Sequence, residues 1–276
     1  MMENHAPFVA DIRIYPIKSL DPVVMDRVEV GKHSFRNDRT FALKTADGKY
    51  INGKRTGRVN QLAATYDLAN NKVFLSERNH VEKTEFELAS HNPALVEFLC
   101  DFFGMRLTLV SSNQGDLLDA PISSSITLVS TESFRSILLA FPHLSLDDLR
   151  LRFRPNIEID GVPSFWEDHL FGIPGLGRKF TIGDVAMTGI SPRARCNVPP
   201  RHPFTGKPAS GFMKQIIKSR AELLPKTSDL AAYGHFYHLC VNTFIGLAEE
   251  GKIIQVGDEL KSLDSVQLSA LGISIE

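Results

Sequence analysis

The sequence predicts a mixed α+β protein that is rich in β-strands, and three observations indicate this fold class. Apolar and polar residues alternate over residues 8–14, which is the two-residue period of a half-buried strand. Asp47-Gly48 and Asn70-Asn71 separate further strand-like runs, as hairpin turns do. Residues 92–103 carry an apolar stripe at helical spacing, with helix-end signals on both sides.

The first part of the chain contains short strand-like runs at close spacing. After residues 8–14, these runs cover residues 23–30, 40–46, 49–51, 62–68 and 72–75. Short strands at this spacing are typical of a small barrel or meander. A helix is predicted at residues 92–103, because Asn92 can cap it, Pro93 suits the first turn and Gly104 can end it in the left-handed conformation.

The second part of the chain has a mixed α/β pattern, which begins after the polar residues 113–116. We therefore predict an N-terminal β-barrel-like domain over residues 7–119 and a second, β-rich domain with peripheral helices over residues 120–262. A strand-like run at residues 106–111 ends the first domain, and the expected strands of the second domain cover residues 126–129, 156–161, 180–190, 236–241 and 252–256. Its expected helices cover residues 132–140 and 212–220, and a further helix can start at residues 145–148.

The composition is that of an ordinary globular protein, with 43% hydrophobic and 23% charged residues among 276. Lys and Arg number 31 against 32 Asp and Glu, so no global charge favours nucleic acid or an anionic membrane. The sequence shows no apolar run near the ~18 residues of a membrane helix and no signal peptide. Three cysteines, an odd number, argue against a disulfide framework, and we expect a cytoplasmic protein.

Residues 191–206 are the segment most typical of a reactive site. Within 16 residues they contain one cysteine, three arginines, a histidine and four prolines. Proline fixes φ and disfavours helix and central strand, so a stiff loop is predicted. Cys196 lies beside Arg195, and neighbouring guanidinium groups stabilise a thiolate, the form that attacks electrophiles or binds metal. The alternative is that Cys196 is a small apolar residue of the core.

Four further segments combine cations or hydroxyl groups with a tight turn or a helix start: Lys18-Ser19, Arg36 to Arg39, Ser130-Thr131, and Arg152 to Asn156. The third can bind an anion at a helix N-terminus. Each segment alone is more often a solvated surface feature. Together with Arg193, Arg195 and Cys196, they predict one pocket for a phosphorylated ligand whose far end meets a thiolate.

Two other patterns are weaker. Gly172, Gly175 and Gly177 resemble a dinucleotide-binding loop, but their spacing is wrong and Pro174 interrupts them. A zinc site could be assembled from four side chains, those of Cys196, His202, His235 and His238. Nine histidines in a chain of this length make such a coincidence common, so zinc is not the favoured hypothesis.

Four motifs, in this order, resemble those of MOSC-domain proteins. They are Ile14-Tyr-Pro-Ile-Lys-Ser19, Arg152-Phe-Arg-Pro-Asn156, Trp166 within Phe165-Trp-Glu-Asp168, and Arg195-Cys196 with Gly206 ten residues after the cysteine. The chain is most similar to the amidoxime-reducing molybdenum enzymes, which carry an N-terminal β-barrel domain ahead of the MOSC domain. The resemblance implies that the second predicted domain, residues 120–262, is a MOSC β-barrel domain.

The same resemblance implies that a pyranopterin molybdenum cofactor binds between the two domains. Cys196 is then the metal ligand, a role that suits a soft thiolate. The cofactor-binding residues that the resemblance implies are Lys18, Ser19, Arg39, Arg154 and Asn156, with Arg195, Ser130 and Thr131 as weaker extensions.

One motif departs from the family pattern. The reductases usually follow the cysteine with Val-Asp-Pro-x-Thr-Gly, and here the sequence is Arg201-His-Pro-Phe-Thr-Gly206. His202 replaces the usual carboxylate, and we expect it to act beside Cys196, because histidine transfers protons near neutral pH. No cysteine follows Cys240, so no internal iron–sulfur cluster is expected. Electrons must then come from a separate ferredoxin-, flavodoxin- or cytochrome-b5-like protein with its reductase.

Three functions remain open from the sequence. The resemblance favours reduction of small N-hydroxylated or N-oxide compounds. The alternative is a sulfur carrier in which Cys196 forms a persulfide, and the third is storage or delivery of the cofactor without turnover. The cations favour the two cofactor hypotheses, because a persulfide alone needs no group that binds phosphate.

Overall fold

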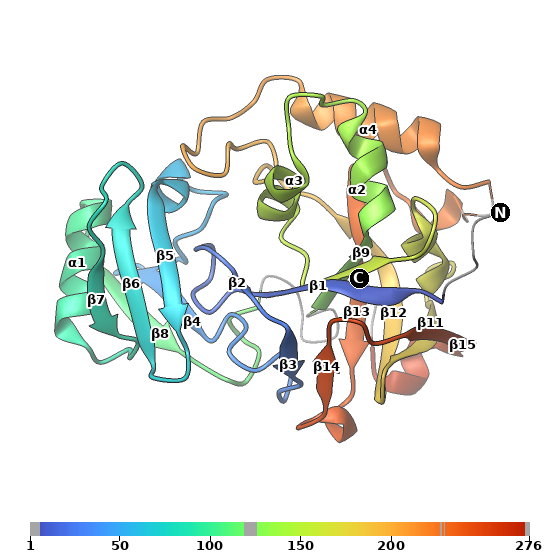
Figure 1. Cartoon of the computed structure of the whole chain (residues 1–276), viewed down its shortest axis with the longest axis horizontal. Helices are drawn as coiled ribbons and strands as arrows, with labels where there is room; N and C mark the ends of the chain where they lie inside the picture. Colours follow the sequence, from blue (N-terminus) through green and yellow to red (C-terminus); the bar gives the residue numbers. More distant parts are fainter. Residues whose placement is uncertain (1–5, 119–125, 227, 229, 274–276) are drawn as a thin grey trace.

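The computed structural model describes residues 6–118, 126–226, 228 and 230–273, and its fold is mixed α+β and rich in strands, as predicted (Figure 1). An eight-stranded sheet has the order β15-β11-β12-β13-β9-β10-β1-β2. Its strands are β1 (Phe8–Ile14), β2 (Val23–Val24), β9 (Ile126–Ser130), β10 (Ile157–Asp160), β11 (Leu176–Ile182), β12 (Val185–Ala194), β13 (His238–Ile245) and β15 (Leu260–Gln267). All neighbours in this large sheet pair antiparallel except β9 and β10, which are parallel.

The core of the large sheet is built from both ends of the chain. Val9, Ile12 and Ile14 of β1 are buried with Ile157 and Ile159 of β10. The register of β1 shifts between Val9 and Asp11, so the strand does not alternate strictly, and a bulge of this kind turns side chains to a new face. Nearby, a two-stranded sheet joins β3 (Arg27–Glu29) to β14 (Ile253–Gln255).

A second unit, which we call the N-terminal module, comprises residues 41–111 and lies to one side of the large sheet (Figure 1). It contains β4 (Phe41–Thr45) paired with β8 (Leu107–Ser111), the sheet of β5 (Leu62–Asp67), β6 (Lys72–Glu77) and β7 (Thr84–Glu87), and helix α1 (Pro93–Phe103). The predicted ends of α1 are confirmed: the Asn92 side chain accepts from two backbone N–H groups, and Gly104 has φ 67°.

The pairing of strands does not follow the two domains predicted from the sequence. The predicted boundary between residues 119 and 120 lies outside the described residues. Strand β1, which belongs to the predicted N-terminal domain, pairs with β10 of the second part, with Phe8 opposite Asp160. The two-domain assignment therefore stays a prediction, and the chain segment that contains β1 crosses it.

Three helices cover the large sheet: α2 (Thr131–Leu138), α3 (Leu146–Phe153) and α4 (Phe212–Leu223) (Figure 1). They enclose an apolar cluster that includes Phe134, Phe153 and Phe212. The Ser145 side chain accepts from the Asp148 N–H, and the Asp148 side chain accepts in return, which is a capping box. Helix α3 therefore begins at a fixed residue, and its C-terminal end delivers Arg152 and Arg154.

Several predicted elements differ in detail. Residues 180–190 form not one strand but parts of β11 and β12, because Gly183, with φ 52°, makes the turn between them. Strand β12 extends to Ala194, so the first residues of the predicted 191–206 loop are strand. Residues 23–30 are split between β2 and β3, and residues 49–51 contribute one bridge from Tyr50 to Lys44. The mostly exposed strands β7 and β15 were not expected.

Within the described residues, no helix combines the length and the apolar character that crossing a bilayer requires.

Candidate functional site

A cavity of about 230 Å³ lies where the N-terminal module meets the large sheet. Its wall comes from residues 52–60 of the module, the end of α3, and the residues after β12. Eight of its lining residues are cationic: Lys18, Arg39, Lys54, Arg152, Arg154, Arg193, Arg195 and Arg201. Among the described residues, none that lines it carries a carboxylate. In a chain of net charge -1, this concentration of cations gives the cavity a positive potential that suits an anion.

Most of the predicted site residues meet at this cavity. The predicted residues that line it are Lys18, Ser19, Arg39, Arg154, Arg195 and Cys196. Asn156 is buried beneath them, where its side-chain oxygen is 3.4 Å from Nη1 of Arg39, and its side-chain nitrogen donates to the Arg13 carbonyl. Residues from four separate segments of the chain therefore converge, as the sequence predicted.

Three of these residues have a backbone conformation that is uncommon for side-chain-bearing residues. Ser19 has φ 70°, and Arg39 and Arg154 each have φ 52°. Arg154 is also the residue that ends helix α3, and its N–H donates to the Arg150 carbonyl. Left-handed conformations at such residues are energetically unfavourable and cluster at functional sites. All three of these residues line the cavity.

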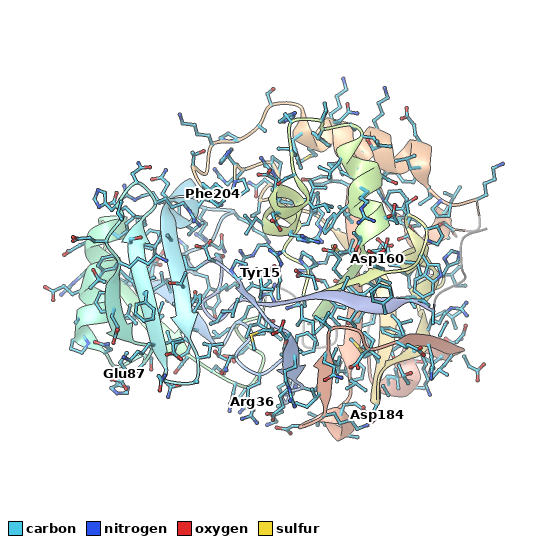
Figure 2. All side chains as sticks on the ribbon, viewed as in Figure 1. Tyr15, Arg36, Glu87, Asp160, Asp184 and Phe204 are labelled. Carbon is cyan, nitrogen blue, oxygen red and sulfur yellow. The ribbon has the colours of Figure 1, made fainter. Side chains whose placement is uncertain are left out.

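Tyr15 is the platform on which two of the arginines rest. The guanidinium carbons of Arg154 and Arg39 lie 4.0 and 4.7 Å from the centroid of its ring. Tyr15 is fully buried, and its hydroxyl donates to the Pro155 carbonyl over 3.0 Å. Burial raises the pKa of Tyr15 to about 12, so the ring stays neutral. Figure 2 shows Tyr15 centrally, between the two parts of the molecule. An aromatic face can hold two like charges near one another.

Arg39 is further fixed by a carboxylate. Its Nη1 is 2.5 Å from Oδ2 of Asp38, which also accepts from the Ser34 hydroxyl. The other oxygen of Asp38 accepts from the backbone N–H of Tyr15. Because Asp38 binds both the platform and the arginine, it ties the loop before β4 to the end of β1. On the same side, the Lys18 ammonium donates to the carbonyls of Leu117 and Leu118 and lies 5.0 Å from the Tyr50 ring.

Cys196 lies two residues after β12 and is a half-buried free thiol on the cavity wall. Its neighbour Arg195 is directed toward the protein interior. The Arg195 guanidinium donates to the carbonyls of Leu239 and Phe153, and its Nη2 is 2.6 Å from Sγ of Cys240. Arg195 therefore fixes the base of the cysteine loop. Burial raises the pKa of Cys240 to about 11, and this second thiol stays protonated at neutral pH.

Besides Asn156, three predicted site residues do not line the cavity. Ser130 is fully buried at the start of α2, where its hydroxyl accepts from the Ser133 N–H. The Thr131 hydroxyl donates to Glu158 and to the Ile159 carbonyl. Both hydroxyl groups thus bond within the protein at the start of helix α2 and do not line the cavity.

The third is His202, whose ring is exposed and whose Nδ1 accepts from the backbone N–H groups of Phe204 and Thr205. The imidazole caps the turn that leads to Gly206. An aspartate at this position can make the same turn through its carboxylate oxygen. The histidine therefore replaces the usual carboxylate as a turn-forming group, and the structure does not place it against the cavity.

Four cations of the cavity were not in the predicted site set: Lys54, Arg152, Arg193 and Arg201. Arg152 and Arg193 were visible in the motifs around Arg154 and Cys196. Their Nη1 atoms bind the Pro199 carbonyl and the Asn242 side chain, respectively. Lys54 carried no signal, and Arg201 was noted only as one arginine of residues 191–206, because their position at the cavity depends on contact between two distant loops.

The zinc hypothesis has little geometric support. In the ranges 6–118, 126–226 and 230–273, no three His, Cys, Asp or Glu residues are grouped as metal ligands. His235 and His238 do stack, with ring centroids 4.3 Å apart. Burial, together with the charge of His235, lowers the pKa of His238 to about 4.

Comparison with known proteins identifies the first part of the chain. Residues 6–118 match the family model described as MOSC N-terminal beta barrel domain. The predicted resemblance to MOSC-domain proteins is thereby confirmed.

Two curated relatives match a larger share of the chain, 75% in each case. Both are named "Molybdenum cofactor sulfurase", one from Caenorhabditis briggsae and one from Caenorhabditis elegans, and both are 24% identical over 229 residues. The chain spans only about a third of their length, 31% and 30%. The matches therefore relate this chain to a part of proteins that are named for the molybdenum cofactor.

A solved structure, the YUAD protein from Bacillus subtilis, aligns with 95% of this chain and 98% of its own at 14% identity. Its TM-score is 0.39, a superposition too loose to assign a fold or a function.

Proposed function

We propose that this protein binds the molybdenum cofactor in the cavity between its two parts and reduces small N-hydroxylated or N-oxide compounds. The observation that carries the proposal is the cavity itself, with eight cations, a half-buried thiol and no carboxylate among its described lining residues. A phosphorylated ligand with a soft metal at its other end matches these groups. An anionic ligand gains from this positive charge, whereas a neutral ligand does not.

Different residues of the cavity would bind different parts of the cofactor. Arg39 and Arg154, fixed on Tyr15, would hold the phosphate, and the Ser19 hydroxyl lies beside them on the cavity wall. Cys196 would ligate the metal. When bound, the cofactor supplies two-electron redox chemistry at molybdenum, and the protein supplies binding and orientation. Asn156 and Asp38 act by keeping Arg39 in place.

Reduction of an N-hydroxyl group consumes two electrons and two protons and releases water. We propose that the electrons come from a separate ferredoxin-, flavodoxin- or cytochrome-b5-like protein. A cytoplasmic location fits this proposal, because Cys100, Cys196 and Cys240 are all free thiols. No role in this proposal falls to His202, since its ring caps a turn and His202 does not line the cavity.

A second candidate is sulfur transfer, and the curated relatives are the observation that favours it. In this case Cys196 would carry a persulfide at the cavity wall and pass its outer sulfur to an acceptor bound there. The same thiol serves both hypotheses, and they differ in whether a metal stays on the protein.

Metal and sulfur analysis of the wild-type protein and Cys196→Ser distinguishes the two. Protein made in a host with the molybdenum cofactor should contain near-stoichiometric molybdenum, oxidise a reduced dye with an N-hydroxylated substrate, and lose this activity in Cys196→Ser. Cys100→Ser is the matched control, because the Cys100 thiol is half-buried but pairs with the Leu107 backbone far from the cavity.

The other outcomes are equally definite. Cyanolysable sulfur on the wild-type protein, absent from Cys196→Ser and with no molybdenum, would establish the sulfur carrier instead. Full reductase activity in Cys196→Ser would remove this thiol from the mechanism, and bound molybdenum without turnover would indicate storage or delivery.

A further inference from the structure

The loop that carries Cys196 also reaches the N-terminal module, and Arg201 makes the connection. Its Nε donates to the Gly53 carbonyl over 2.7 Å, across the junction. Its Nη1 donates to the Gly206 carbonyl over 3.0 Å, within the loop's own end. One guanidinium group thus joins two segments that are about 150 residues apart in the sequence.

The two segments approach as closely as backbone allows. A Cβ on Gly206 would lie 2.1 Å from the Gly57 carbonyl oxygen, and one on Gly57 would lie 2.8 Å from the Gly206 carbonyl oxygen. Gly206 also has φ 69°, a conformation that favours glycine. Any side chain at Gly206 would therefore push the loop away from the module.

Further side chains bind the carbonyl groups of this proline-rich loop. From the module, Asn60 donates to the Pro203 carbonyl and Gln61 to the Thr205 carbonyl. The Arg78 guanidinium lies 4.7 Å from the centroid of the Phe204 ring, which Figure 2 shows beside the module. Proline lacks an N–H and interrupts regular pairing, so a loop rich in proline depends on side-chain donors for its carbonyl groups.

From the large-sheet side, Arg152 holds the same loop. Its Nη1 donates to the carbonyls of Pro199 and Arg201 over 2.9 and 2.7 Å. The residues from Cys196 to Pro203 that line the cavity are therefore held from both sides, although β12 ends at Ala194.

We infer that Arg201 is a positioning residue that sets the distance between Cys196 and the cations Lys18 and Arg39 on the opposite wall. We call Arg201, with the carbonyls of Gly53 and Gly206, the Arg201 clasp. The thiol lies on the proline-rich loop, and the two cations lie on segments that precede the module. Because these segments are more than 150 residues away along the chain, the backbone alone does not fix the distance between the thiol and the cations. The clasp supplies this fixed distance because it binds the Cys196 loop to the module, and the Lys18 N–H in turn donates to the Phe41 carbonyl of the module. The role of the clasp in cofactor retention rests on the proposed function. The contact between Arg201 and the two carbonyl groups is independent of that function.

Arginine suits this position better than lysine. Its planar guanidinium presents several N–H donors in a fixed arrangement and can satisfy two carbonyl groups simultaneously. An ammonium group on a flexible chain can bind either carbonyl without fixing the angle between them. Arg201→Lys should therefore restore part of the coupling that Arg201→Ala removes.

Hydrogen–deuterium exchange of the full chain tests the clasp without reference to the cofactor. Arg201→Ala should speed exchange roughly ten- to a hundredfold in residues 52–61 and 196–206 together, because it removes two hydrogen bonds from a charged donor. The β5–β6 hairpin should keep its protection. Arg55→Ala is the control, because Arg55 is an exposed cation of the same segment.

Cofactor retention is the second measurement. After repeated gel filtration, Arg201→Ala should lose at least ten times as much molybdenum as the wild type, and Arg201→Lys should be intermediate. Unchanged exchange in Arg201→Ala, or faster exchange in only one of the two segments, would overturn the clasp. Coupled exchange without any molybdenum in the wild type would keep the clasp and refute the proposed cofactor instead. Coupled exchange with unchanged retention would refute its role in positioning Cys196.

Discussion

Replacing Tyr15 by phenylalanine and by leucine separates the two contacts that this side chain makes. Phenylalanine keeps the ring under Arg39 and Arg154 but removes the hydroxyl that donates to the Pro155 carbonyl. Leucine removes both. A buried carbonyl left without its donor destabilises a protein by about 1–3 kcal/mol, which is the expected effect of Tyr15→Phe.

Tyr15→Leu should destabilise the protein further. Each of the two guanidinium contacts contributes about 0.5–2 kcal/mol, the upper end applying where the groups are desolvated. Arg39 is buried, so the two contacts together account for about 1–4 kcal/mol beyond the effect of Tyr15→Phe. Without the ring, repulsion between the two cations also favours their separation, and cofactor affinity should fall about tenfold, or ~1.4 kcal/mol.

Urea unfolding measures the first effect, and the molybdenum that each variant retains after gel filtration measures the second. The expected order of retention is wild type, then Tyr15→Phe close to it, then Tyr15→Leu well below. Equal retention by the two variants would show that the ring does not organise the arginines, however large the loss of stability. Loss of molybdenum in Tyr15→Phe alone would instead make the hydroxyl the important group.

Two further predictions concern residues outside the cavity. Ser130→Ala should destabilise the protein by about 1 kcal/mol, because helix α2 loses its N-terminal cap, and cofactor retention should not change. Reduced retention at wild-type stability would show instead that Ser130 binds the cofactor. His238 has a pKa of about 4, mainly because of burial, so as pH falls below about 6.5 the unfolded chain binds a proton that the folded protein does not. Stability should therefore decline between pH 6.5 and 4, by at most about 3 kcal/mol from this residue. Urea unfolding of His238→Leu should show a shallower decline over that range, and an unchanged slope would contradict it.

Local sequence signals predicted the parts of the fold that depend on neighbouring residues. Helix α1 has both of its predicted ends because Asn92 and Gly104 act on adjacent backbone groups. The β5–β6 hairpin likewise follows from the turn at Asn70-Asn71, where Asn71 has φ 52°. The strand β15 was missed because five consecutive residues of it are exposed, so its sequence lacks the alternation that marks a half-buried strand.

For the cavity, the motifs predicted which side chains meet but not how they are held. Lys18, Arg154 and Cys196 were grouped by their chemistry and by the family resemblance. Tyr15 as the platform and Arg201 as the clasp depend on tertiary contacts between distant segments, and no local pattern specifies those. Ser130 was overestimated because a helix cap and an anion-binding hydroxyl have the same sequence signature.

The pairing of β1 with β10 has a consequence for the order in which the molecule can be made. When residues 1–118 have left the ribosome, the N-terminal module has all of its strands, whereas β1 still lacks the neighbour that Phe8 will face, Asp160. The module is in effect an insertion within the large-sheet part, which closes only when β10 has been synthesised. A single cut between the two parts therefore cannot yield two complete units. A fragment that reproduces the large sheet must keep residues 8–30 and join them to residue 126 by a new linker.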